Sequence, residues 1–219
     1  MATNAGEYRF IYVNFDSSRR RQHKPREALR SQVRETVRAA ILDAAEELIA
    51  LKGLHGAALA QIAKKAGVAV GTLYNYFEDR DALVRALFET RRATLRPKVQ
   101  EAFSGGAGLS FEPRLRKFMR DLFEAFESHR RYLKVLFEAE HLKPAGGHQD
   151  LLTAIDEIIA IGVSEGVLGK SSVEPLSITL AGALRGVLVR KSQSGGSFVD
   201  AADPIVTLLI DGARKRVRP

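Results

Sequence analysis

Residues 61–77 read QIAKKAGVAVGTLYNYF, and this stretch decides the fold of the first part of the chain. Gly67 lies between two short apolar segments, where a tight turn favours a residue without a Cβ. Leu73 and Phe77 are four residues apart, so in a helix they share one face and can anchor it from beneath. We therefore predict a helix-turn-helix over about residues 58–77.

The second helix of this motif carries five side chains that do not face inward: Val70, Gly71, Thr72, Asn75 and Tyr76. The major groove of DNA admits an α-helix, and the N-terminal residues of such a helix reach the base edges. These residues are therefore candidates for DNA contact. Lys64 adds positive charge nearby, either on a solvated face or in contact with DNA.

The same stretch resembles the DNA-binding domain of the TetR (tetracycline repressor) family of bacterial regulators. The resemblance covers about residues 34–88 and is carried by Ile62-Ala63, Ala66-Gly67-Val68, Gly71-Thr72-Leu73-Tyr74, Tyr76-Phe77, Arg80 and Leu83. The ending GTLYxYF makes it specific, because several helix-turn-helix families share the turn glycine but not this ending.

The resemblance implies a role for each candidate residue. Thr72 and Tyr76 would contact phosphates at the edges of the groove, and Arg80 matches a phosphate-binding lysine or arginine just past the motif. The residues nearest the bases would be Val70, Gly71 and Asn75. Tyr74 would either pack against the first helix of the motif, which is the preferred interpretation, or contact DNA.

Two features depart from the family pattern. The family begins the first helix of the motif with threonine or serine, where this chain has Ala57 and Ala58. Ala69 replaces the serine that caps the recognition helix. A missing hydroxyl cap costs about 1 kcal/mol of helix stability. The changes also remove a hydroxyl group that could bind phosphate.

Beyond the motif, apolar residues recur at three- and four-residue steps without a convincing strand, which indicates helices throughout. Asp79 fits the N-cap of the helix that follows the motif. We predict an all-α chain of about nine helices. Residues 1–30 would be a flexible basic arm and residues 31–80 the DNA-binding domain. Residues 81–219 would be the helical effector-binding and dimerisation domain that the resemblance implies.

The charge of the chain is unevenly distributed. Its 219 residues include 34 Lys and Arg against 26 Asp and Glu, which gives a net charge of +8. Residues 1–104 hold 18 of these basic and 12 of these acidic side chains, so most of the excess lies in the first half. A polyanion partner explains this, although a basic surface also serves solubility. The basic run at residues 19–26 would grip phosphates or an adjacent minor groove.

Six of the 11 phenylalanines fall between Phe103 and Phe137. TetR-type regulators have an effector pocket in their C-terminal helices, and the predicted lining here is Phe103, Phe118, Phe123, Phe126 and Phe137. This concentration favours an apolar small-molecule effector, although phenylalanines at helical spacing are also ordinary core. Glu138 is either a polar contact to that ligand or a surface group.

The last two predicted helices are mostly apolar, and the resemblance implies that they pair two copies of the chain. The predicted interface is Leu180, Leu184, Val187, Leu188, Ile205, Leu208 and Leu209. A homodimer interface of this kind pairs one patch with itself. Burial within one monomer is the alternative explanation.

Composition and motifs argue against several classes of protein. The chain has no cysteine, which removes disulfides and thiolate metal sites. No apolar run reaches the ~18 residues of a membrane span, so no membrane partner is expected. Residues 162–166 read GVSEG and match the GxSxG pattern, but they lie at the end of a predicted helix, whereas a nucleophile elbow joins a strand to a helix. The sequence contains no HExxH zinc motif. We expect no enzyme activity, catalytic residue, metal or cofactor.

Together these features predict a cytoplasmic, nucleoid-associated transcriptional regulator that binds specific DNA sequences. In its simplest form it is a ligand-responsive repressor that binds a palindromic operator in double-stranded DNA as a homodimer. The alternatives are a non-specific, architectural DNA-binding protein and a co-regulator that binds a protein instead of an operator. A specificity ratio of ~10³ or more for one DNA sequence favours the regulator.

Overall fold

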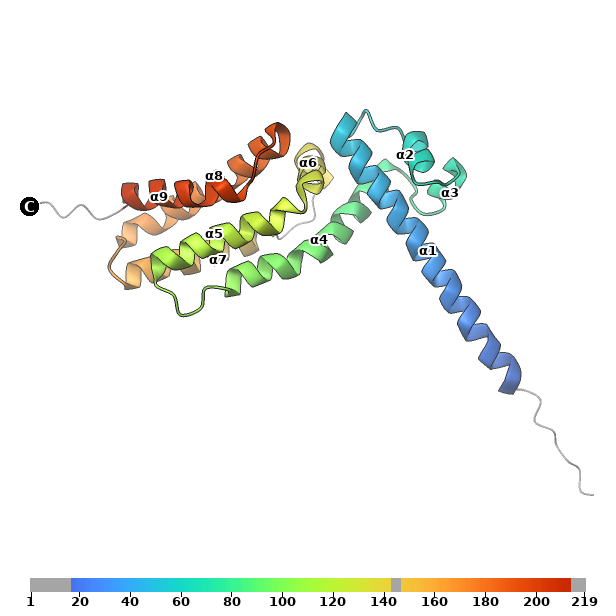
Figure 1. Cartoon of the computed structure of the whole chain (residues 1–219), viewed down its shortest axis with the longest axis horizontal. Helices are drawn as coiled ribbons and strands as arrows, with labels where there is room; N and C mark the ends of the chain where they lie inside the picture. The colour runs from blue at the N-terminus through green and yellow to red at the C-terminus, as the bar shows by residue number, and fades with distance from the viewer. Residues whose placement is uncertain (1–16, 143–146, 214–219) are drawn as a thin grey trace, which may run out of the picture. The chain divides into compact units, whose positions relative to one another are not determined.

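The computed structural model describes residues 17–142 and 147–213, and within them all regular structure is helical (Figure 1). These residues form nine α-helices, which confirms the predicted all-α fold class. No helix among them is long and apolar enough to cross a membrane. The chain divides into two units, residues 1–40 and residues 41–219. The domain boundaries expected at residues 30 and 80 stay predictions.

Helix α1 spans Ser17–Lys52 and begins earlier than the sequence suggests. Residues 17–30, expected in a flexible arm, are helical, while residues 1–16 lie outside the described residues. The difference has a physical reason, because arginine, glutamine and glutamate are good helix formers even where no apolar period reveals the helix. Gly53 follows the helix with a φ of +80°.

Three helices of the second unit follow α1 in the chain: α2 (Leu59–Lys65), α3 (Val70–Tyr74) and α4 (Arg80–Ser104). Asp79 caps α4 as predicted, since its carboxylate accepts a hydrogen bond from the Ala82 N–H at 2.6 Å. Ala58 and Ala69 precede α2 and α3 without a side-chain cap bond. Neither helix therefore has the N-cap hydrogen bond that a serine or threonine at these positions would provide.

Five further α-helices complete the chain: α5 (Phe111–Glu127), α6 (Arg130–Glu138), α7 (Gly147–Ser164), α8 (Val173–Ser194) and α9 (Ala202–Ala213). Short 3-10 turns occur at Glu140–Leu142, Lys170–Ser172 and Val199–Ala201. Helices α5, α7, α8 and α9 lie side by side, with α4 along α5 and α6 against α8 (Figure 1). They share one apolar core.

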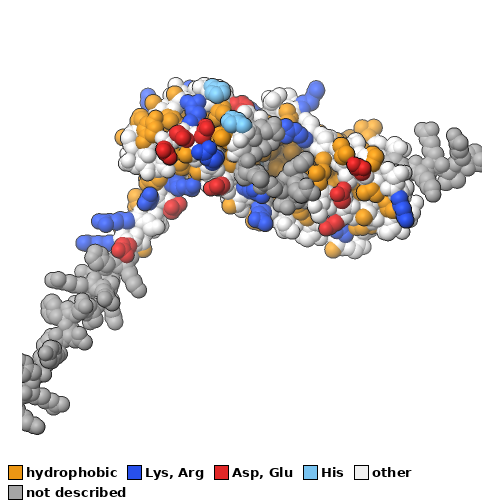
Figure 2. All heavy atoms as spheres, turned by 180° about the vertical axis from the view of Figure 1, so that it is seen from behind, with side chains coloured by type: hydrophobic (Ala, Val, Ile, Leu, Met, Phe, Trp, Pro, Cys, Tyr) orange, Lys and Arg blue, Asp and Glu red, His pale blue; other side chains and the backbone are white. Residues whose placement is uncertain are grey.

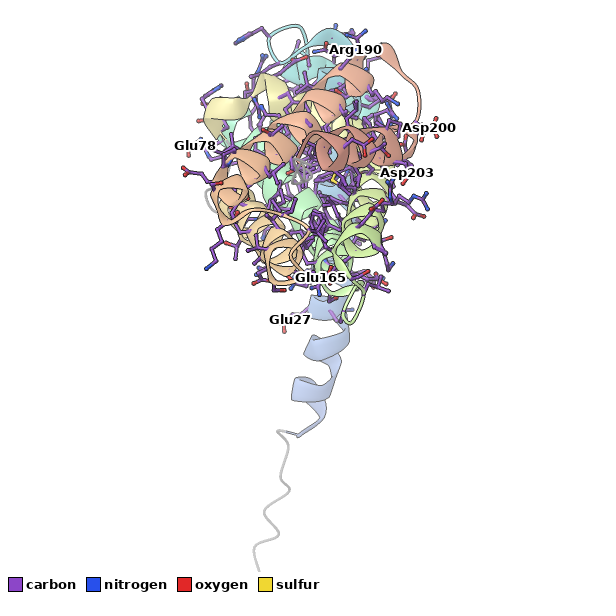
Figure 3. All side chains as sticks on the ribbon, turned by 90° about the vertical axis from the view of Figure 1, so that its left-hand side faces the viewer. Glu27, Glu78, Glu165, Arg190, Asp200 and Asp203 are labelled. Carbon is purple, nitrogen blue, oxygen red and sulfur yellow. The ribbon has the colours of Figure 1, made fainter. Side chains whose placement is uncertain are left out.

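Helices α5 and α7 approach closely at Gly162. A Cβ added to this glycine would lie 2.8 Å from a methyl carbon of Leu168 and from the ring of Phe111. Both side chains are buried, so neither can move aside without disturbing the core. Glu165, labelled in Figure 3, adds a polar link, because its carboxylate accepts a hydrogen bond from the Phe111 N–H at 3.1 Å.

The connection between α8 and α9 is held by Arg130 at the start of α6. Its guanidinium donates to the carbonyl oxygens of Lys191 and Gly196 and lies 4.0 Å from the ring centroid of buried Phe198. Glu127 accepts a hydrogen bond from the Phe198 N–H at 2.8 Å. The corner between α5 and α6 therefore fixes where α9 begins.

Candidate nucleic-acid interface

Gly67 builds the turn between α2 and α3. Its φ of +74° lies in the left-handed region, which an L side chain adopts at a cost. Its N–H donates to the Lys64 carbonyl at 3.2 Å, and the Val68 N–H donates to the Ala63 carbonyl at 3.0 Å. These bonds close α2 and turn the chain into α3, as the helix-turn-helix prediction requires.

Helix α3 has a buried side and an exposed side. Leu73 and Phe77 are buried beneath it, as the sequence predicts. The exposed residues of the helix and its C-cap are Val70, Gly71, Tyr74 and Asn75, while Thr72 and Tyr76 are half-buried. The five positions of the motif that are predicted to contact DNA therefore lie on its exposed side or at the edge of that side.

Tyr74 differs from the sequence interpretation, which preferred packing against the first helix of the motif. Its side chain is 50% exposed, and Val70, four residues earlier, is 42% exposed. Residues four apart lie on the same face of a helix. The period that turns Leu73 inward therefore turns Tyr74 outward, and this signal was present in the sequence.

The two lysines at the end of α2 have different surroundings. Lys65 Nζ lies 2.8 Å from Glu47 Oε1 on α1, and this hydrogen bond lowers the pKa of Glu47. Glu47 also lies 3.7 Å from Arg131 Nη1 on α6. Lys64 is exposed. Lys64 is therefore the better candidate of the two lysines for a phosphate contact.

Arg80 has a structural partner as well as its expected role. Its Nη1 donates to the carbonyl oxygen of Leu54 at 2.6 Å. The N–H of the same buried residue donates to Glu138 Oε2 on α6 at 2.8 Å. A guanidinium has five N–H donors, so the bond to Leu54 does not prevent Arg80 from also binding a phosphate. The phosphate contact of Arg80 stays a prediction. No local sequence pattern predicts the hydrogen bond between Glu138 and the loop after α1.

The junction between α1, α4 and α6 combines ion pairs with a buried aromatic pair. Arg91 on α4 pairs with Asp43 and Glu46 on α1. The rings of Phe88 and Tyr132 meet edge to face with centroids 6.0 Å apart. Burial raises the pKa of Tyr132 to about 12. Figure 2 shows basic and acidic side chains interspersed on the face drawn there, without one continuous basic patch.

The five phenylalanines predicted to line an effector pocket separate into two groups. Phe118 and Phe123 are buried in the core, and Phe103 lies against Phe118 with ring centroids 5.6 Å apart. Phe126 and Phe137 instead line a largely apolar cavity between α5, α6, α7 and α8. The correction has a simple cause, because one helical stripe can serve both the core and a cavity beside it.

The residues predicted for the dimer interface also separate. Leu180, Leu184 and Leu188 are buried in the core of their own chain and are not available to a second copy. Val187, Ile205 and Leu209 are half-buried. Leu208 is 76% exposed, and Ile178, which the sequence did not single out, is 63% exposed. An apolar period does not distinguish a face covered by the same chain from one covered by another.

Residues 41–87 match the family described as "Bacterial regulatory proteins, tetR family". They include the whole helix-turn-helix described above. This helix-turn-helix domain belongs to the tetR family. The chain is also similar to curated proteins over short stretches. The fatty acid metabolism regulator protein of Bacillus subtilis is 39% identical over 61 residues, which are 28% of this chain and 31% of that protein. The matched stretches span less than half the length of this and the next curated relatives.

Two solved structures extend the similarity from the tetR-type domain to the fold of the chain. A TetR-like transcriptional regulator from Rhodococcus sp. RHA1 has a TM-score of 0.67 at 23% identity, over 80% of this chain and 94% of that one. The FadR regulator of Bacillus subtilis, solved with stearoyl-CoA, has a TM-score of 0.61 at 19% identity, over 80% and 99%. At these identities the likeness concerns the fold, including the helices after the tetR-type domain.

Proposed function

We propose that this protein is a transcriptional regulator that binds a specific DNA sequence through α3 and responds to a small molecule. The observation that carries the proposal is the exposed side of α3, where Val70, Gly71, Tyr74 and Asn75 lie over buried Leu73 within a tetR-family domain. This short helix presents no charged side chain of its own. Sequence choice would therefore come from small, apolar and amide groups, and affinity from charges around them.

Binding to a pool of random double-stranded DNA tests the proposal. We expect selection to enrich a palindromic sequence bound at least ~10³-fold more tightly than unrelated DNA. Asn75→Ala is expected to change which sequence is enriched. Lys64→Gln is expected to weaken all sequences alike and to lower the salt slope by about one. Lys170→Gln, an exposed lysine near the start of α8, is the control and should leave both unchanged.

The same experiment distinguishes the alternatives. Equal affinity for enriched and random DNA would favour an architectural DNA-binding protein. No measurable affinity for any DNA would favour a co-regulator that binds a protein. Either result would overturn the proposed regulator.

The response to a small molecule is supported by the contacts of Leu54. Its N–H is held by Glu138 at the end of α6, and its carbonyl is held by Arg80 at the start of α4, directly after the motif. A shift of α6 would therefore change how the loop after α1 holds α4. An effector among the later helices could in this way favour one spacing of two recognition helices over another.

Pairing of two copies is supported by exposed apolar residues on α8 and α9. Leu208 is more than three-quarters exposed, and Gly212, four residues further, has open space where a side chain would begin. Leu208→Glu is expected to convert a dimer into a monomer in light scattering, because it places a charge in an apolar contact. Leu109→Glu, at an exposed leucine before α5, is the control. A monomeric wild-type chain would count against palindrome binding.

The basic run at residues 19–26 would add phosphate contacts to those of the motif. Replacing Arg19, Arg20 and Arg21 by glutamine is expected to weaken DNA binding and reduce its salt slope, because each neutralised phosphate releases counterions. An unchanged slope would show that this run has no part in binding.

A further inference from the structure

A cavity of about 320 Å³ lies between α5, α6, α7 and α8. This volume lies at the lower end of the range of small-molecule sites. Its lining is apolar apart from one side chain and consists of Phe126, Leu133, Leu136, Phe137, Leu151, Leu152, Ile178, Ala181, Gly182, Leu184, Arg185 and Leu188. Four helices contribute to it, and it opens to solvent beside α8, where the lining residue Ile178 is 63% exposed.

Arg185 is the one charged side chain among the described residues that line this cavity. Its guanidinium carbon lies 5.5 Å from the centroid of the Phe137 ring, which also belongs to the lining. The positive group is therefore placed at the apolar wall. A guanidinium has a planar set of N–H donors that matches the oxygens of a carboxylate or a phosphate.

We infer that this cavity binds a small molecule with an apolar body and one anionic group, which Arg185 holds. An apolar body gains by leaving water for the leucine and phenylalanine walls. A cationic group on the same molecule would face the like charge of Arg185, and a neutral one would forgo the charge-assisted hydrogen bond. The inference names the ligand class for the proposed small-molecule response and rests on that response for its regulatory meaning.

The position of Phe137 connects this cavity to the DNA-binding part. Phe137 lines the cavity, and the next residue, Glu138, accepts the hydrogen bond from the Leu54 N–H. We expect a molecule that wedges the α6 wall of the cavity outward at Phe137 to shift the backbone that carries Glu138. Binding in the cavity could therefore alter the position of the loop after α1, because the cavity residue Phe137 and the loop contact Glu138 are adjacent in the chain.

Calorimetric titration of the full chain with three matched probes tests the ligand class without DNA. Decanoate, decanol and decyltrimethylammonium share an apolar chain and differ in the charge of the head group. We expect decanoate to bind about tenfold more tightly than decanol, and the cation to bind more weakly than either. Equal affinity for decanoate and decanol, or no binding of any probe, would overturn the inference.

Variants of Arg185 test the assigned contact. Arg185→Gln is expected to lower the affinity for decanoate about tenfold, to that for decanol, and to leave the affinity for decanol unchanged. Arg190→Gln is the matched control, because it removes an exposed arginine from the same helix outside the cavity lining (Figure 3). An equal loss for both probes in Arg185→Gln would mean a structural role for Arg185 and would overturn the assignment.

Two glycines of α8 offer a matched test of the place of binding. Neither Gly182 nor Gly186 has an atom within 4 Å of an added Cβ, so both accept a side chain without a clash at that atom. Gly182 lines the cavity and Gly186 does not. Gly182→Leu is expected to reduce decanoate binding at least tenfold by filling the cavity, whereas Gly186→Leu should not. If Gly182→Leu instead changed the mass in light scattering and left decanoate binding intact, a second copy would cover this groove and the inference would fail.

Failure of the inference and failure of the proposed function give different results. A chain that selects a palindrome but binds none of the probes keeps the proposed DNA recognition and loses the ligand class. A chain that binds decanoate through Arg185 but selects no DNA sequence keeps the cavity assignment and loses the proposed regulator.

Discussion

At the scale of single residues, two glycines of the motif serve different purposes. Gly67 is required by its positive φ in the turn. Gly71 lies on the exposed side of α3, where an added Cβ meets no other atom within 4 Å. Gly67 is needed for the conformation of the turn. Gly71 has no side chain that would hold DNA away from the backbone of α3.

Substitution of each glycine by alanine separates these purposes. Gly67→Ala is expected to destabilise the chain by about 1–2 kcal/mol in urea unfolding, because alanine adopts the left-handed region at that cost. Gly71→Ala is expected to raise stability by up to about 1 kcal/mol, because alanine favours the helical conformation over glycine, and to weaken binding to the selected DNA. A loss of stability in Gly71→Ala equal to that in Gly67→Ala would contradict the surface role.

At the scale of helices, the sequence predicts where some helices begin and end better than it predicts the contacts between helices. The Asp79 cap and the turn at Gly67 were predicted, because capping and left-handed turns depend on local chemistry. The early start of α1 at Ser17 was not, because its first residues show no apolar period. The bond from the Leu54 N–H to Glu138 joins residues 84 positions apart, and no local pattern reports such a pair.

Two helix N-caps provide a matched test of local chemistry. Asp79 accepts a hydrogen bond from α4, whereas Ser110, the N-cap of α5, makes no side-chain cap bond. Asp79→Ala is expected to lower the free energy of unfolding by about 1 kcal/mol, and Ser110→Ala to change it much less. Thermal and urea unfolding of both variants measure the difference. Equal effects would mean that the cap bond of Asp79 does not stabilise α4.

His129, at the N-cap of α6, predicts a dependence of stability on pH. The pKa of His129 is lowered, mainly because burial disfavours its charged form, and the positive charges of Lys98 and Arg91 lower the pKa further. The hydrogen bond to the Ala125 carbonyl and the negative charge of Glu46 act in the opposite direction and raise the pKa. The unfolded chain then binds the proton more readily. Stability from this group is therefore present above the unfolded pKa of about 6.5 and is lost as the pH falls below it.

His129→Gln tests this sign. The variant is expected to lose less stability than the wild type between about pH 7 and pH 5, as measured by urea unfolding at each pH. His55→Gln, at an exposed histidine in the loop after α1, controls for the loss of an imidazole. A steeper loss of stability in His129→Gln would contradict a lowered pKa.

At the scale of the whole chain, the sequence predicted which residues of the helix-turn-helix are buried and which are exposed, but not which residues line the cavity between α5, α6, α7 and α8. The motif is contiguous, so its period assigned buried Leu73 and exposed Asn75 correctly. The cavity draws its walls from four helices, and phenylalanine spacing on one of them could not separate Phe126 from Phe118. The charged residue of the cavity, Arg185, lies in a segment whose apolar residues are predicted to form a dimer interface.

The coupling between cavity and motif predicts a variant that keeps both binding reactions and loses their connection. Glu138→Ala removes the acceptor of the Leu54 N–H and should destabilise the chain by about 1–3 kcal/mol. We expect it to bind decanoate and the selected DNA separately, while decanoate no longer changes its DNA affinity. Glu138→Gln retains an acceptor and should keep part of the response. Glu124→Ala, at an exposed glutamate of α5, is the control. An undiminished response in Glu138→Ala would exclude this route.

The hydrogen bond that Leu54 donates also makes one backbone amide a reporter of regulation. Exchange of this amide hydrogen with deuterium from solvent requires the bond to Glu138 to open, so its rate gives the free energy of that local opening. The same rate measured with the cavity filled, with DNA bound, and with both would give the coupling free energy between the two sites from a single atom. Hydrogen exchange at the Leu54 amide can therefore measure the coupling without a dye or label attached to the cavity or to α3.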